Sequence, residues 1–312
     1  MTSSPARIEA KQRPADRVFS GLAIGAGAFI LFALAGVALF LVAQSIPAFF
    51  ADPSEIKGEP ESFWAFVWPL VFGTLWSSFL ALLIAVPLAV GIALFISHYA
   101  PRKLAQSLGY MIDLLAAVPS VVFGLWGAQV LAPTIQPFYD WLVTNLGWIP
   151  LFAPPVSGTG RTILTVAIVL AVMILPITTA ICREVFLQTP RINEEAALAL
   201  GSTRWEMIRM AVLPFGRAGV VSGVMLGLGR ALGETMAVAM VLSPAAVISF
   251  VLTSSQNPST IPSNIALNFP EAHDIGVNVL IATGLILFIV TFIVNAIARW
   301  IVSRRKEFSG AN

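Results

Sequence analysis

Residues 219–243 read GVVSGVMLGLGRALGETMAVAMVLS, an apolar run that contains two charged residues, Arg230 and Glu234. A membrane-spanning helix needs about 20 apolar residues, so this run is long enough to cross a bilayer. Charged side chains inside a span are costly and usually pair inside a bundle or line a pathway. Because they are four residues apart, Arg230 and Glu234 are expected to share one helix face and to pair there. The stretch therefore predicts a membrane protein and marks a functional position inside it.

The composition of the whole chain agrees with this stretch. Of 312 residues, 57% are hydrophobic and 11% are charged, against about 25% charged in an ordinary soluble domain. The mean hydropathy is +0.87. The single cysteine, Cys182, excludes an internal disulfide and a multi-cysteine metal site. The predicted fold class is therefore an all-α, polytopic transmembrane bundle.

Hydropathy predicts six membrane spans in one transmembrane domain, residues 18–303. Their approximate ranges are 18–44, 66–97, 105–131, 161–182, 219–243 and 276–301. The first apolar run is too long for a cleaved signal peptide, so we expect a retained helix. The predicted tails are residues 1–17 and 304–312, and the largest internal loop is residues 183–218.

Lysine and arginine residues decide the orientation of the spans. With a cytoplasmic N-terminus, fifteen of these residues fall in inner segments, whereas only Lys57 and Arg161 fall in outer ones. Positively charged residues are enriched in cytoplasmic segments of membrane proteins. We therefore expect both termini, and the loop of residues 183–218, to face the cytoplasm.

Residue patterns typical of enzymes and metal sites are missing from the sequence. It contains no P-loop and no HExxH motif. His98 and His273 stand alone and fall on opposite sides of the predicted membrane. No catalytic residue, metal ligand or bound cofactor is therefore expected. If ATP drives transport here, another chain must supply the nucleotide site.

Glycines recur every fourth residue before the two charges, at Gly219, Gly223 and Gly227. This spacing predicts a face on which membrane helices pack closely. Gly223, Gly227, Arg230 and Glu234 fall along roughly one side of a continuous helix. We therefore expect the charges to face a neighbouring helix or a central pathway rather than lipid.

The internal loop of residues 183–218 predicts two short helices joined by a bend. Thr189-Pro190 is the expected start of the first helix, and Gly201 is a natural stop. Ser202-Thr203 can cap a second helix, which is expected to end before Pro214. Such an elbow is suited to contact another protein, although a simple surface hairpin is the alternative.

A motif with fixed spacing runs through this loop: Glu195-Ala196-Ala197, Gly201 and Leu213-Pro214. It resembles the EAA loop of ABC-importer permeases. Ala211 stands where that family usually has a larger aliphatic residue, which puts only the fine packing in question. The resemblance implies the type I ABC importer permease fold. It also implies that Glu195, Ala196, Ala197 and Gly201 contact a groove of a cytosolic ATPase.

Two further stretches resemble the phosphate-importer permeases of this family. They are VPSVVFGLWG, residues 118–127, and GRALGETMAV, residues 229–238. The continuation GETMAV is similar to the PstC type, whereas the PstA type usually continues GETAPL. The resemblance implies a heterodimer with a PstA-type permease in a bacterial inner membrane. It further implies a PstB-type ATPase dimer that binds ATP and Mg²⁺, and a PstS-type phosphate-binding protein.

With this resemblance, Arg230 and Glu234 become candidates for contact with phosphate. Arginine presents planar donors suited to oxyanions. A carboxylate can accept from the hydroxyl of protonated phosphate, which sulfate lacks, so Glu234 would penalise sulfate. The alternative is a structural ion pair that locks the fifth span. Ser120 and Thr235 are secondary pathway candidates, unless they only bond to helix backbone.

The predicted function is the permease subunit of an ATP-driven phosphate importer, forming half of the translocation pathway. A permease for another oxyanion, molybdate or sulfate, is one alternative, and the PstA-type partner subunit is another. An ion-coupled carrier is a third alternative, which the EAA loop disfavours.

Overall fold

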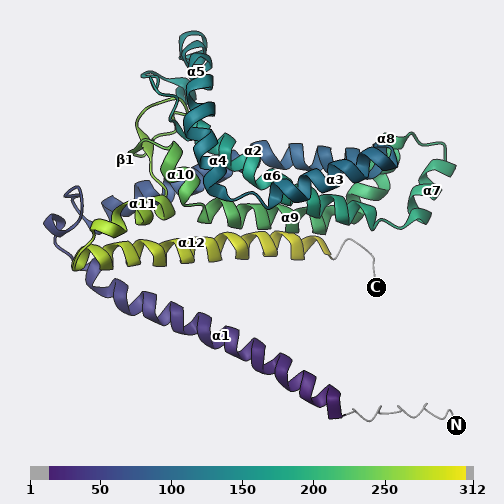
Figure 1. Ribbon diagram of the computed structural model, residues 1–312, viewed down its shortest axis with the longest axis horizontal. Coiled ribbons are helices and arrows are strands. Elements are labelled where there is room, and N and C mark those ends of the chain that lie inside the picture. Colours follow the sequence, from purple (N-terminus) through teal and green to yellow (C-terminus); the bar gives the residue numbers. More distant parts are fainter. Residues whose placement is uncertain (1–13, 307–312) are drawn as a thin grey trace.

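The computed structural model describes residues 14–306 and is built almost entirely of helices. Most of the two predicted tails, residues 1–17 and 304–312, therefore lies outside the described residues. Four long helices run side by side: α2 (Phe63–Leu94), α6 (Ile163–Leu187), α9 (Leu213–Gly233) and α12 (Ile275–Lys306) (Figure 1). A fifth, α1 (Pro14–Phe49), meets α12 at one end and then diverges from it.

Within the described range, five helices are long and apolar enough to cross a membrane, or six if one bent pair counts as a span. The all-α, polytopic fold predicted from hydropathy is confirmed. Side-chain caps explain where two of the spans begin: Ser62 accepts from the amide of Ala65, and Thr162 accepts from that of Thr165. Each cap satisfies one backbone amide that the first turn of a helix leaves unpaired.

The predicted third span, 105–131, is wrong as a single helix. The chain forms α3 (Arg102–Ala116), α4 (Ser120–Trp126), a π-helical turn η3 (Gly127–Leu131) and α5 (Ala132–Leu146). The axis bends by 90° between α3 and α4, and α5 stands across the long helices (Figure 1). Pro119 explains the break, because a proline disfavours the helical conformation of the residue before it.

The predicted fifth span, 219–243, is also wrong as one helix. The described helix begins earlier, as α8 (Arg204–Met207), and continues through a π-helical turn η5 (Ile208–Val212) into α9. It ends at Gly233, and a separate short helix α10 (Met236–Val241) follows. The expected stop before Pro214 does not occur. Pro214 directly follows the π-helical turn η5, and such a local adjustment lets a membrane helix continue past a proline.

Short elements and irregular chain close the end of the molecule where α1 meets α2. They are η1 (Pro53–Glu55), η4 (Pro150–Phe152), β1 (Pro244–Ala245), β2 (Asn257–Pro258), α11 (Ile261–Asn268) and η6 (Phe269–Glu271). This is the outer end expected from the charge distribution, and β1 pairs in parallel with β2. At the other end of α2, the helix finishes in a π-helical turn η2 (Phe95–Tyr99).

Asn257 holds the irregular outer segment, residues 242–260, against the start of α6. Its Oδ1 accepts from the amide of Ile163 at 2.9 Å, and its Nδ2 donates to the carbonyls of Arg161 and Ser243. Backbone bonds add to this: the amide of Leu252 donates to Leu151 and that of Ser157 to Thr253. Irregular backbone persists near a membrane only where it is buried in protein and hydrogen-bonded in this way.

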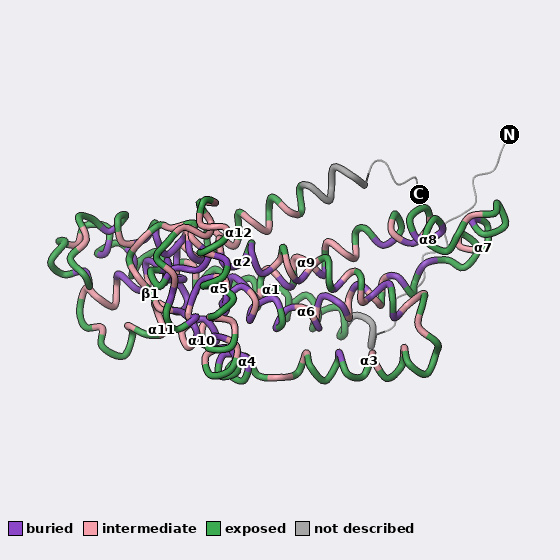
Figure 2. Tube along the Cα trace, turned by 90° about the horizontal axis from the view of Figure 1, so that it is seen from above, coloured by how far each residue is buried: buried purple, intermediate pink, exposed green. Residues whose placement is uncertain are grey.

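The core lies around α6, the most buried of the spans (Figure 2). It packs most extensively on α2 and next on α9. At the opposite end from α11, another apolar cluster joins α2 to a helical hairpin, residues 191–207. This segment is called the cytoplasmic hairpin because the distribution of lysine and arginine predicts that side of the membrane. That hairpin contains α7 (Arg191–Ala199) and α8.

Candidate functional site

The structure brings together the two stretches singled out around residues 118–127 and 229–238. Each stretch contains a helix break, one before Ser120 and one at Glu234-Thr235. The short helices that follow the breaks, α4 and α10, pack directly on each other. Broken helices inside a membrane protein commonly line substrate sites, because their ends expose polar backbone groups.

Glycines in α4 and η3 allow this contact to be close. A Cβ added to Gly124 would lie 2.8 Å from Cα of Ala237 and 3.0 Å from Sδ of Met240. One added to Gly127 would lie 2.6 Å from Cγ2 of Val169, on α6. The spacing of small residues in the FGLWG stretch is therefore explained by close packing of α4 and η3 on α10 and α6.

Glu234 lies outside the helix that carries Arg230. Its backbone is extended (φ −69°, ψ 123°), so α9 ends at Gly233. The side chain is buried, and its Oε1 accepts from the amide of Ala237 at 3.0 Å. Glu234 therefore caps the start of α10. The predicted placement of both charges on one helix face is wrong, because the four-residue spacing spans a break.

Arg230 lies in the last turn of α9 and is half-buried. A cation at this position is favoured by the helix dipole. Among residues 18–300, whose side chains the structure describes, no carboxylate forms an ion pair with Arg230. The predicted Arg230–Glu234 pair is therefore absent from the described chain, and the guanidinium keeps its donors for another acceptor.

The secondary candidates also flank the two breaks. Ser120 is the first residue of α4, and Thr235 immediately precedes α10. The hydroxyl of Thr235 donates to the carbonyl of Gly233 at 3.2 Å. Both residues are half-buried.

The glycine row of α9 faces α6. A Cβ on Gly219 would lie 2.2 Å from Cγ2 of Val185, and one on Gly223 would lie 3.2 Å from Cγ2 of Ile181. One on Gly227 would lie 2.9 Å from Oγ1 of Thr178. The row thus lets the backbone of α9 approach α6 more closely than any larger residue would.

The cytoplasmic hairpin has the expected elbow. Gly201, with φ at 85°, follows α7 and turns the chain, a conformation that favours glycine. Thr203 caps α8 in a capping box with Glu206. The hydroxyl of Ser202 donates to the carbonyl of Ala197 at 2.6 Å and tightens the bend.

The residues of the EAA motif do not all face outward. Glu195, Ala196 and Gly201 are exposed, whereas Ala197 is buried against the body of the protein. Exposed apolar side chains extend the outward face of the hairpin, and Ile192 and Leu200 are the most exposed of the large ones on α7 and its end. Ala197 therefore packs the hairpin onto the spans rather than presenting a contact surface.

Sequence reasoning missed a contact between the hairpin and α2. Nε2 of His98 lies 3.5 Å from Oε1 of Glu194. The sequence treats His98 as an isolated residue because its partner is 96 positions away, and no spacing rule connects a span end with a distant loop. Only the packing of α2 against the hairpin brings the two side chains together.

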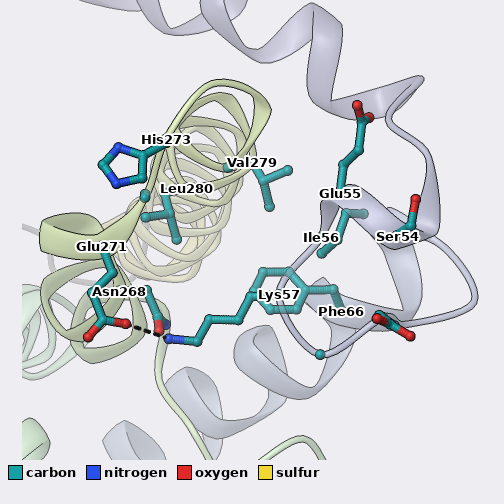
Figure 3. A pocket seen from close by; sticks show the side chains of 14 residues that line it. Ser54, Glu55, Ile56, Lys57, Phe66, Asn268, Glu271, His273, Val279 and Leu280 are labelled. Carbon is teal, nitrogen blue, oxygen red and sulfur yellow. Dashed lines mark hydrogen bonds and ion pairs between the residues drawn. The ribbon is translucent and has the colours of Figure 1, made fainter.

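A pocket of about 420 Å³ lies at the outer end, between the loop around residue 57 and the start of α12. Lys57 and Glu271 meet across it at 3.2 Å (Figure 3). Phe66, Val279 and Leu280 supply apolar lining, and His273 stands at its edge. None of the residues at the two helix breaks lines this pocket.

The chain is similar to a known family, to named relatives and to a solved structure. Residues 85–307 match the family described as binding-protein-dependent transport system inner membrane component. A phosphate transport system permease protein PstC 2 of Mycobacterium tuberculosis is 46% identical, with 95% of each chain covered. A PstC protein of Mycobacterium leprae is 45% identical over 94% of this chain and 95% of its own. An inward-facing structure of the MetNI methionine ABC transporter matches with a TM-score of 0.46 at 18% identity, over 76% of this chain and 95% of that chain.

Proposed function

We propose a working mechanism from one premise: the chain belongs to the family of binding-protein-dependent transport system inner membrane components. It is the permease subunit of an ATP-driven phosphate importer in a bacterial inner membrane. It is not itself the ATPase, and a separate subunit hydrolyses ATP.

The partners of the subunit follow from this role. A permease of this family works with an ATPase and an external binding protein. The second permease is of the PstA type, the ATPase is a PstB-type dimer that holds ATP and Mg²⁺, and the external protein is of the PstS type. Support for these identities comes from the PstC names of the relatives.

The cytoplasmic hairpin is the surface that contacts the ATPase. Glu195, Ala196 and Gly201 are exposed there, together with the apolar side chains of Ile192 and Leu200. Leu213-Pro214 lies at the start of α9, so a displacement of the hairpin is passed directly to that span. Rigid-body movement of packed helices is a common way to transmit such a change.

Arg230 is the residue that meets phosphate, and the single observation that carries this assignment is its lack of an ion pair among the described residues. A half-buried guanidinium without a carboxylate is complementary to an oxyanion that passes it. Ser120 and Thr235, at the ends of the two broken helices, add polar groups near the same contact between α4 and α10.

Glu234 acts as a selectivity element rather than as a brace for Arg230. One of its oxygens accepts from the amide of Ala237, so the carboxylate is held at the break between α9 and α10. Its other oxygen can accept from the hydroxyl of protonated phosphate. Sulfate has no such hydrogen near neutral pH, and a buried acceptor without a donor penalises it.

Uptake into vesicles that contain the complete complex tests this assignment. Arg230→Lys removes the planar fork of donors and is expected to lower ATP-dependent phosphate uptake by about tenfold or more. Glu234→Gln keeps an oxygen for the cap but can donate to sulfate, so sulfate should begin to compete. Arg217→Lys, an exposed change at the cytoplasmic start of the same helix, is the matched control.

Each outcome of the uptake measurements decides one part of the assignment. Full activity of Arg230→Lys excludes bidentate contact with phosphate, and unchanged selectivity of Glu234→Gln excludes the screening role. Uptake that prefers molybdate or sulfate in the wild type would identify a permease for another oxyanion. Uptake without ATP would identify an ion-coupled carrier.

A further inference from the structure

A shielded ion pair ties the end of α2 to the cytoplasmic hairpin. The side chains of His98 and Glu194 are 9% and 23% exposed, and Nε2 lies 3.5 Å from Oε1. The other ion pair among the described side chains of residues 18–300, between Lys57 and Glu271, is 65% and 76% exposed. Solvent and salt screen the exposed pair strongly, whereas the pair at the hairpin keeps more of its attraction.

Both ring nitrogens of His98 lie near a polar neighbour. The hydroxyl of Ser97 donates to the carbonyl of Ala93 at 2.8 Å, which uses its one hydrogen. Its oxygen, 2.7 Å from Nδ1 of His98, then accepts from that nitrogen. Nε2, on the other side of the ring, lies beside the carboxylate of Glu194. The imidazole is therefore held between its own helix end and the hairpin.

No other polar contact joins the hairpin to the spans. Across the described chain, no further hydrogen bond or ion pair links residues 191–207 to a different span. The remaining attachment is apolar: Ala197 and Met207 share one buried cluster with Ala93 and Leu94 of α2 and with Cys182 and Phe186 of α6. Apolar contact allows sliding, because it has little directional preference, whereas the ion pair sets one register between α7 and α2.

We propose that His98 and Glu194 form a positioning joint that makes α2 follow the cytoplasmic hairpin when the ATPase moves it. The inference rests on the proposed function and adds a second route to the one through α9. α2 can carry the movement onward, since it has the most extensive packing on α6. At its outer half, a Cβ on Gly73 would lie 2.1 Å from the carbonyl oxygen of Ser259, so α2 also touches the irregular outer segment.

The test compares phosphate uptake with ATP hydrolysis in the reconstituted complex of permeases, ATPase and binding protein. The variants are His98→Gln, Glu194→Gln, the double variant and His98→Lys, which restores a cation. Glu184→Gln is the matched control, because it removes an exposed carboxylate near the same membrane face. Among the described residues, the Glu184 carboxylate accepts one hydrogen bond, from the side chain of Gln188. Co-purified ATPase and the thermal midpoint report whether each complex is intact.

We expect each single neutral variant to lower the number of phosphates moved per ATP by about fivefold or more. The double variant should lower this ratio no further than either single variant, because each single variant already removes the one shared contact. His98→Lys should restore most of the wild-type number of phosphates moved per ATP, and Glu184→Gln should leave that number unchanged. A wild-type complex that fails to move phosphate with ATP would refute the proposed function and not the joint.

Three results would overturn the joint while leaving the proposed function standing. In the first, the double variant moves far fewer phosphates per ATP than either single variant. In the second, Glu184→Gln lowers the ratio as much as the variants of the joint. In the third, His98→Lys forms an intact complex whose ratio stays low. If His98→Gln does not assemble, His98→Lys decides the matter. Assembly with normal coupling supports the joint, and assembly without coupling refutes it.

Discussion

At the scale of single residues, the fully buried Asn257 makes three hydrogen bonds between distant parts of the chain. Its partners are Ile163, the first residue of α6, Arg161, two residues earlier, and Ser243, beyond the end of α10. Asn257→Ala leaves the amide of Ile163 without a partner, and each buried unpaired group costs about 1–3 kcal/mol. We expect a thermal midpoint several degrees lower in detergent. Asn268→Ala, which loses one bond within α11, should stay close to wild type.

A midpoint for Asn257→Ala equal to that of the Asn268→Ala control would contradict this role. Such a result would mean that water replaces the amide in all three contacts, and that the outer segment is held by its backbone bonds alone.

Glu234 shows what residue-level reading could and could not predict. The sequence identifies it as important, because a carboxylate within an apolar run is costly and rare. Its partner could not be predicted, because the four-residue spacing places it beside Arg230 only if the helix is continuous. The break at Glu234 depends on the packing of α10 against α4, which links positions more than 100 residues apart.

At the scale of elements, the glycine spacing in the sequence correctly predicted the face of α9 that packs on α6. Gly219→Ala forces a Cβ to within 2.9 Å of Cβ of Val185, and such overpacking costs about 1–3 kcal/mol. We expect a lower thermal midpoint. Gly229→Ala on the same helix meets no atom within 4 Å, so its better helix propensity, worth up to about 1 kcal/mol, should leave stability unchanged or raised.

Equal stability of the two alanine variants would show that α9 and α6 separate easily. It would remove the reason for the glycine spacing. The same measurement on Gly227→Ala, whose Cβ would meet Oγ1 of Thr178 at 2.9 Å, gives an independent reading of the same contact.

Element boundaries were harder to predict than element positions. The helices that cover the first, second, fourth and sixth predicted spans follow the hydropathy runs, because each is one long apolar stretch. The third and fifth were predicted as continuous because hydropathy does not register a bend. The break at Pro119 was not predicted, and Pro214, which was expected to follow the end of a helix, lies inside a helix that continues past it through a π-helical turn.

At the scale of the whole molecule, the distribution of arginine and lysine makes the orientation testable. In a Cys182→Ser background, Lys57→Cys and Gln188→Cys place exposed thiols at opposite ends of the bundle. A membrane-impermeant maleimide should label Lys57→Cys in intact spheroplasts and Gln188→Cys only after permeabilisation. The reverse pattern would invert the topology and place the hairpin outside the cell. Cys182→Ser removes the single cysteine of the chain, so the background should be low.

The position of α1 has a consequence for how this subunit reaches its folded state. α1 packs on α12 near its outer end, and most of its length carries exposed large apolar side chains, among them Phe19, Leu31 and Phe32. Lipid or a second subunit must cover that length, and either acts as a ligand of the folded form. Mass action then makes the measured stability of the chain depend on the amount of that ligand. Synthesis in excess over its partners should therefore shorten the lifetime of this subunit in the cell.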